Sequence, residues 1–70
     1  MYMSVYKVVE LVGTSEESFE AAAKAAVETA SKTLRDLRIA EIDSMDMQIE
    51  DGKIVTYRTK VKVSFKFEGS

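Results

Sequence analysis

The residue types that carry most protein chemistry are missing from this sequence. Its 70 residues include no His and no Cys, so neither a Ser-His nor a Cys-His nucleophile pair can form. The common ligands of zinc and other transition metals are missing for the same reason. Lys and Glu remain as acids and bases, but their spacing singles out no pair. We therefore predict that this protein is not an enzyme.

Acidic side chains gather between residues 43 and 51 and offer oxygen ligands that suit a hard cation such as Ca²⁺. They are Asp43, Asp46, Glu50 and Asp51. The spacing differs from a calcium loop of the EF-hand type, because Met45 and Met47 stand where that loop needs oxygen donors. A solvated strand is the simpler interpretation. A cation shared between copies of the chain is the alternative.

Basic residues alternate with apolar and polar ones near the C-terminal end: Arg58, Lys60, Lys62 and Lys66. Surfaces that bind nucleic acid usually place aromatic side chains among the basic ones. Here Tyr57 and Phe65 have the opposite parity and point to the other face of a strand. We interpret the basic row as a charge ladder paired with Glu41 and Asp43, and we expect no nucleic-acid partner.

The elements that position these residues follow from hydrophobic spacing and turn signals. β-Branched residues over 5–12 predict a strand. Thr14 followed by Glu17 is typical of a capping box and predicts that a helix begins there. Free N–H groups at such a start could bind an anion, but a cap alone is the simpler interpretation. Apolar residues then recur at helical spacing: Phe19, Ala22, Ala23, Ala26, Val27, Ala30, Leu34 and Leu37.

Asp51-Gly52 predicts a two-residue turn that joins two antiparallel strands. The strand over 53–68 alternates cleanly, and the turn sets which residues of the preceding strand lie opposite its own. Lys60 is expected opposite Asp43, Lys62 opposite Glu41, Val61 opposite Ile42 and Val63 opposite Ala40. The same register puts Met45, Met47, Ile49 and Ile54 together on the charged face, away from the helix. We interpret this apolar patch as a subunit interface, a ligand site, or both, and expect assembly to depend on it.

The fold class that these elements predict is α+β. A β-α-β-β chain forms a three-stranded antiparallel sheet in the order first, third, second strand, and one helix packs on one face. Residues 1–70 make a single domain. A domain this small usually needs a disulfide, a metal or self-association for stability. Because Cys and His are absent, we expect self-association.

Charge and hydropathy limit the partners and the location. The formal net charge of −2 gives no general attraction to nucleic acid or to an acidic membrane. No apolar run approaches the roughly 18 residues of a membrane span. The apolar N-terminal stretch carries Lys7 and Glu10, and no small-residue cleavage site follows it, so we expect no signal peptide. Absent Cys also fits a reducing compartment, and we predict a cytoplasmic protein.

Four stretches of this chain resemble the dodecin family, and the likeness extends from residue 4 to residue 68. The most specific features are Val12-Gly13-Thr14-Ser15 before the helix, Ala40-Glu41-Ile42 on the second strand, and the long closing strand. The resembling stretches are 6–19, 31–42, 50–53 and 57–65. The resemblance implies a β-α-β-β subunit that assembles as a hollow homododecamer of cubic symmetry. Many dodecins bind riboflavin, FMN or FAD in pairs between subunits and store them.

The resemblance also identifies candidate ligand-binding residues. Ile39 stands where flavin-binding dodecins have the Trp that stacks on the isoalloxazine ring, and Arg58 stands where they have a Gln at the ring edge. Met45, from the apolar patch, is the third candidate. A branch of the family with Arg-Val or Arg-Ile before Ala, and with Tyr-Arg on the third strand, resembles the chain more closely, and it includes a calcium-associated dodecin. The predicted function is a flavin-storing shell. The alternative is a shell without tightly bound flavin that holds a cation or another small ligand, or acts as a scaffold.

Overall fold

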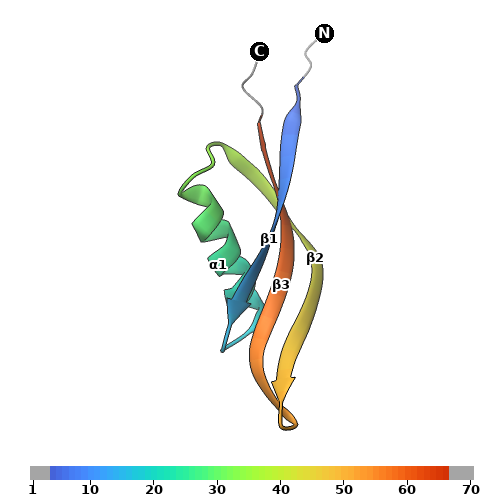
Figure 1. Ribbon diagram of the computed structural model, residues 1–70. Helices are drawn as coiled ribbons and strands as arrows, with labels where there is room; N and C mark the ends of the chain where they lie inside the picture. The colour runs from blue at the N-terminus through green and yellow to red at the C-terminus, as the bar shows by residue number, and fades with distance from the viewer. Residues whose placement is uncertain (1–3, 67–70) are drawn as a thin grey trace.

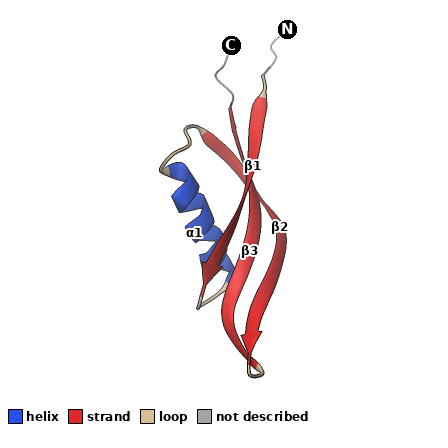
Figure 2. Ribbon diagram, viewed as in Figure 1, coloured by secondary structure: helices blue, strands red, loops and turns tan. Residues whose placement is uncertain are grey.

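The computed structural model describes residues 4–66. Its sheet is antiparallel in the order β1-β3-β2, and one helix lies against one face (Figures 1 and 2). The elements in chain order are β1 (Tyr6–Ser15), α1 (Phe19–Ser31), β2 (Leu37–Glu50) and β3 (Lys53–Lys66). The predicted β-α-β-β fold and strand order are confirmed. The last two residues of the strand predicted over 53–68 lie outside the described residues.

The helix begins four residues later than the predicted capping box. Ser18 is the N-cap, and its Oγ accepts a hydrogen bond from the Ala21 N–H at 3.0 Å. Thr14 remains in β1, where it pairs with Arg58 of β3. Gly13 therefore does not end the strand. The prediction was wrong because continued pairing with β3 holds residues 13–15 extended, which leaves the next Ser to cap the helix.

The helix also ends earlier than its apolar stripe predicted. It stops at Ser31, whereas Leu37 opens β2. Leu34 and Leu37 still pack against the core, but from the connection and from the sheet. In the same connection Asp36 has a φ of 58°, and Asp tolerates this left-handed conformation better than most residues. The reversal at Asp36 turns the chain from the helix into β2.

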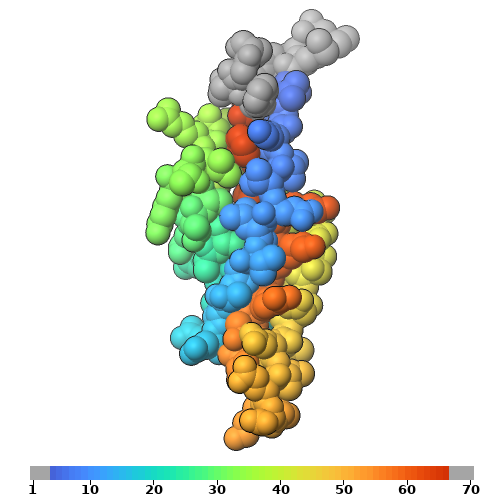
Figure 3. Space-filling view, in the orientation of Figure 1, coloured from blue at the N-terminus to red at the C-terminus, as the bar shows by residue number. Residues whose placement is uncertain are grey.

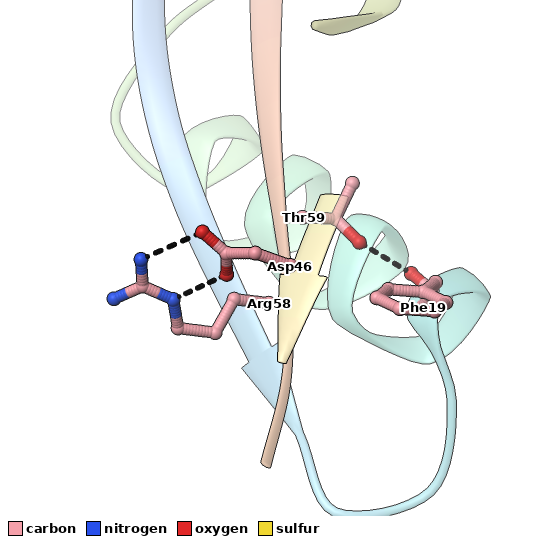
Figure 4. Close-up of polar contacts among 4 residues, drawn as sticks. All are labelled: Phe19, Asp46, Arg58 and Thr59. Carbon is pink, nitrogen blue, oxygen red and sulfur yellow. Dashed lines mark hydrogen bonds and ion pairs between the residues drawn. The ribbon is translucent and has the colours of Figure 1, made fainter. Parts of the chain in front are cut away.

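The core lies between the helix and the centre of the sheet. Ala22, Ala26 and Ala30 are buried on α1, and Val61 and Val63 are buried on β3. Small Ala side chains let the helix lie close to the strands, so the core is thin. Toward the start of α1, the buried Thr59 hydroxyl donates to the Phe19 carbonyl at 2.9 Å (Figure 4). The Phe19 ring also meets the Tyr57 ring edge-on, with centroids 5.1 Å apart.

The β2–β3 hairpin turns at Asp51 and Gly52, with φ values of 52° and 75°. Positive φ at both residues matches the predicted type I′ turn. The register confirms three predicted pairs, namely Lys62 with Glu41, Val61 with Ile42, and Val63 with Ala40.

The fourth predicted pair is wrong, because Lys60 lies opposite Ser44 and not Asp43. The register shifts between Gln48 and Ile49 and again between Ile42 and Ser44. The second shift leaves Asp43 as the extra residue of a β-bulge.

The two register shifts together place Met45 and Met47 on the other face of the sheet. Met45 lies opposite Thr59 and Met47 opposite Tyr57, and facing residues share a face. Thr59 and Tyr57 contact Phe19 of α1, so both methionines are on the helix side. The predicted location of the apolar patch, on the charged face, was therefore wrong.

The two methionines are exposed even though they lie on the helix side, at 56% for Met45 and 43% for Met47. The hairpin end of β2 and β3 projects past α1 (Figures 1 and 3). Beyond Leu37, every residue of β2 is exposed.

Candidate ligand-binding face

The sheet face opposite α1, called the outer face below, carries the basic row of β3 between acidic and apolar neighbours. Three rows of facing residues cross it from β1 through β3 to β2. They are Glu10–Lys62–Glu41, Val12–Lys60–Ser44 and Thr14–Arg58–Asp46. The strand alternation that places these side chains also turns Val61 and Val63 inward to the core. No element of residues 4–66 covers the outer face.

The strongest polar contact on the outer face joins Arg58 of β3 to Asp46 of β2. The Arg58 Nε donates to Asp46 Oδ1 at 2.7 Å, and Nη2 donates to Oδ2 at 2.9 Å (Figure 4). This two-point geometry is the favoured one for a guanidinium and a carboxylate. The Arg58 hydrogen bonds, with the charges of Arg58 and Lys60, lower the pKa of Asp46. The same hydrogen bonds raise the pKa of Arg58.

A small cavity of about 40 Å³ opens beside this ion pair. It is lined by Val12, Ser44, Asp46, Arg58 and Lys60. Its volume suffices for a water molecule or a small ion. The lining joins two cationic side chains, one carboxylate and one hydroxyl, so positive charge exceeds negative charge around the cavity.

Lys60 and Lys62 form looser ion pairs beside the cavity. Lys62 Nζ lies 3.7 Å from Asp43 Oδ1 and 4.0 Å from Glu10 Oε2, and Lys60 Nζ lies 3.9 Å from Asp43 Oδ2. The predicted charge ladder is confirmed in part. Asp43 reaches both lysines from its bulge, whereas Glu41 only lies opposite Lys62, and Glu10 forms the second ion pair with that lysine. Exposed pairs of this kind contribute about 0–1 kcal/mol each to stability.

Ile39 belongs to an apolar row at the other end of the outer face. It lies opposite Ser64, and Ser64 lies opposite Val8 on its other side. Ile39 is 65% exposed and Val8 54% exposed. The Ser64 hydroxyl donates to the Ile39 carbonyl at 3.5 Å. Two aliphatic side chains flanking a small Ser make a shallow platform suited to a flat apolar group.

The structure does not bring the three predicted site residues together. Ile39 lies opposite Ser64 of β3, and Arg58 is six positions before Ser64 in the same strand. At about 3.3 Å per residue, this separates them by about 20 Å along the strand. Met45 is on the opposite face. A compact ligand that contacts both Ile39 and Arg58 therefore needs them from two copies of the chain.

No three carboxylates among residues 4–66 converge closely enough to hold a metal ion. The acidic segment lies along the extended strand β2 and its turn, so its carboxylates are spread along the strand and do not meet at one point. Within the same described range, no helix is long and apolar enough to cross a membrane.

Sequence reasoning missed two residues of the outer face. Asp46 was recognised only as one acid among several, because the unshifted register puts Met45 opposite Arg58. The available signal was that Asp46 directly follows Met45, the residue expected opposite Arg58. Val8 was recognised only as a strand residue, and nothing local indicated that it shares a row with Ile39.

Comparison with known proteins places the chain in a family. Residues 5–68 match the model of the family described as Dodecin. The chain therefore belongs to the dodecin family, as its sequence predicted.

Three relatives illustrate this similarity. The calcium dodecin of Mycobacterium tuberculosis is 45% identical over 64 residues, or 91% of this chain and 90% of the relative. A dodecin of Thermus thermophilus is also 45% identical over 64 residues, or 91% of this chain and 93% of the relative. The solved dodecin of Streptomyces coelicolor is 38% identical, with a TM-score of 0.92 and full coverage of both chains.

A solved structure of the Mycobacterium tuberculosis calcium dodecin also matches. It is 47% identical with a TM-score of 0.82, covers 96% of each chain, and is described as calcium chelating with a novel calcium-binding site.

Proposed function

We propose that this chain is the subunit of a hollow homododecamer that binds and stores a small ligand, with a flavin as the first candidate. The observation that carries the proposal is the apolar row of Ile39, Ser64 and Val8. It lies exposed on the outer face, and the three rows beside it each carry charged residues. The same proposal describes a cytoplasmic protein of one domain that has no catalytic role and no nucleic-acid or membrane partner.

Self-association is supported by what the chain leaves uncovered. Large apolar side chains are exposed along β2 and the hairpin: Ile42, Met45, Met47, Ile49 and Ile54. An exposed apolar surface of this kind is typical of an interface. The buried core of residues 4–66 is thin, because its side chains come from three Ala, two Val and one Thr. A second copy against β2 would add the apolar burial that a small domain lacks.

A flavin site between subunits is supported by the separation of Ile39 from Arg58. The apolar row offers a surface for the isoalloxazine ring, although Ile39 gives no aromatic stacking, which adds about 1 kcal/mol beyond area burial. Arg58 then comes from another copy and meets the ring edge or the side chain of the flavin.

Titration of ligand-free protein into dilute FMN tests this function, with flavin fluorescence as the readout. We expect quenching that saturates at one flavin for two or fewer subunits, and sedimentation velocity should show a dodecamer. Unchanged fluorescence of both FMN and riboflavin at micromolar protein would exclude flavin storage. A monomer in sedimentation would exclude the shell.

A shell that holds a cation is the second candidate, and the relative named calcium dodecin favours it. Carboxylates of one chain do not converge, so the cation would lie between copies, with ligands from Asp43, Asp46, Glu50 or Asp51. Calcium titration of chelator-treated protein by calorimetry tests this candidate, with magnesium as the matched control. Equal or absent heats for the two cations would contradict a calcium site.

A further inference from the structure

The ion pair of Arg58 with Asp46 bears on which ligands the outer face accepts. We propose that Asp46 is a specificity-determining residue that occupies the N–H donors of Arg58, so that the site binds ligands without a phosphate and disfavours phosphorylated ones. This inference rests on the proposed function in one respect, which is that Arg58 is a ligand-contacting residue.

A carboxylate and a phosphate compete for the same N–H donors of Arg58. A guanidinium binds either group through two parallel N–H···O hydrogen bonds. In this chain Asp46 already receives that pair of bonds, at 2.7 and 2.9 Å. An incoming phosphate at this edge of Arg58 must first displace Asp46, and it meets the repulsion of the carboxylate while it does so.

The side chains that line the cavity beside the ion pair carry charges of both signs. Arg58 and Lys60 both line it, and the carboxylate there belongs to Asp46. Lys60 has a second, looser partner in Asp43, at 3.9 Å. With Asp46 neutralised, Arg58 and Lys60 would face a cavity whose remaining lining is Val12 and the Ser44 hydroxyl. Two cations and a hydroxyl make a suitable set of donors for a phosphate.

Stability explains little of the two-point pairing of Arg58 with Asp46. Both side chains of the pair are about half exposed, and exposed ion pairs add little to stability. Asp43 provides a matched comparison, because it is a carboxylate of the same strand and contacts lysines only. If any carboxylate on β2 disfavoured phosphorylated ligands, removal of Asp43 and removal of Asp46 would change the affinity for these ligands equally.

Riboflavin and FMN make a matched pair of probes, because they share the isoalloxazine ring and differ by one phosphate. Each is titrated by fluorescence against the wild type, Asp46→Asn and Asp43→Asn, all checked for assembly by sedimentation. We expect Asp46→Asn to shift the ratio of the two dissociation constants toward FMN by about tenfold or more, as removing a close charge would do. Asp43→Asn should shift it by less than about threefold. An unchanged ratio in Asp46→Asn, or an equal shift in both variants, would overturn the inference.

Calorimetry with inorganic phosphate separates this inference from the proposed function. If neither flavin binds any of the proteins, flavin storage fails, and the phosphate titration alone decides the role of Asp46. We expect Asp46→Asn to bind phosphate more tightly than the wild type and Asp43→Asn, and we expect Arg58→Gln added to it to remove the gain. Equal or absent phosphate binding in all of them rejects the role of Asp46.

Discussion

Gly13 of β1 lies so close to the Ala22 carbonyl of α1 that no side chain fits between them. A Cβ atom placed on Gly13 would come within 1.9 Å of the Ala22 oxygen and 3.0 Å of the Ala26 Cβ. The obstacle is helix backbone, which cannot rotate away as the end of a flexible side chain would. Gly13 therefore sets how closely the helix approaches the sheet.

Gly13→Ala should destabilise the fold, because the helix must move away from β1 and loosen the Ala-Val core. We expect a loss of about 1–3 kcal/mol in the free energy of unfolding, typical of overpacking, measured by urea denaturation. Gly52→Ala is the control, because its loss of stability should have a different cause. Gly52 has open space around it and a φ of 75°, so the loss should be about 1 kcal/mol from backbone strain alone. A Gly13→Ala variant as stable as the wild type would contradict the close packing.

Met47→Asp should weaken assembly, because it places a charge in the exposed apolar surface of β2. We expect sedimentation velocity to show a shift from the dodecamer to smaller species. Gln48→Asp is the matched control, since Gln48 is the next residue along and lies opposite Thr56, on the other face. A Met47→Asp variant that still sediments as a dodecamer would show that this surface is not the interface.

Ile39→Trp combined with Arg58→Gln should raise flavin affinity. The Trp would extend the apolar row of Ile39, Ser64 and Val8 with a ring that stacks on the isoalloxazine, and each aromatic pair contributes about 0.5–1.5 kcal/mol. We expect FMN quenching at roughly tenfold lower protein concentration for the double variant. Val5→Trp, at an exposed residue just before β1, controls for a non-specific aromatic effect. Without a gain over this control, the platform would not be a flavin surface.

The contribution of the Asp46–Arg58 pair to stability should disappear in acid. The pKa of Asp46 is lowered from 3.8 by Arg58, so the folded state binds a proton less readily than the unfolded state. The stabilisation is complete above 3.8 and is lost as the pH falls through the lower pKa of the folded state. Melting temperatures of the wild type and Asp46→Asn should therefore differ slightly at neutral pH and converge in acid. A difference that grows on acidification would contradict this sign.

Local patterns sufficed to predict the elements and their order. Alternation over β3, helical spacing of Ala22, Ala26 and Ala30, and the Asp51-Gly52 turn each act within a few residues, so a sequence displays them directly. The start of the helix was not decidable in this way. Thr14 and Ser18 are both good caps, and the choice between them depends on how far β1 stays paired with β3.

The candidate site depended more heavily on long-range geometry. Ile39 and Arg58 were identified from the sequence by resemblance. Their common place on the outer face and their distance of about 20 Å along β3 follow from the sheet register. The register shifts between Gln48 and Ile49 and at Asp43 together reassign Met45 to the helix side and bring Asp46 opposite Arg58. Side chains alternate with a period of two, so one extra residue exchanges the faces of all that follow. The amino-acid types of this chain are enough for its strands, helix and turn, whereas the partners of Arg58 and Met45 are settled by pairing across the whole sheet.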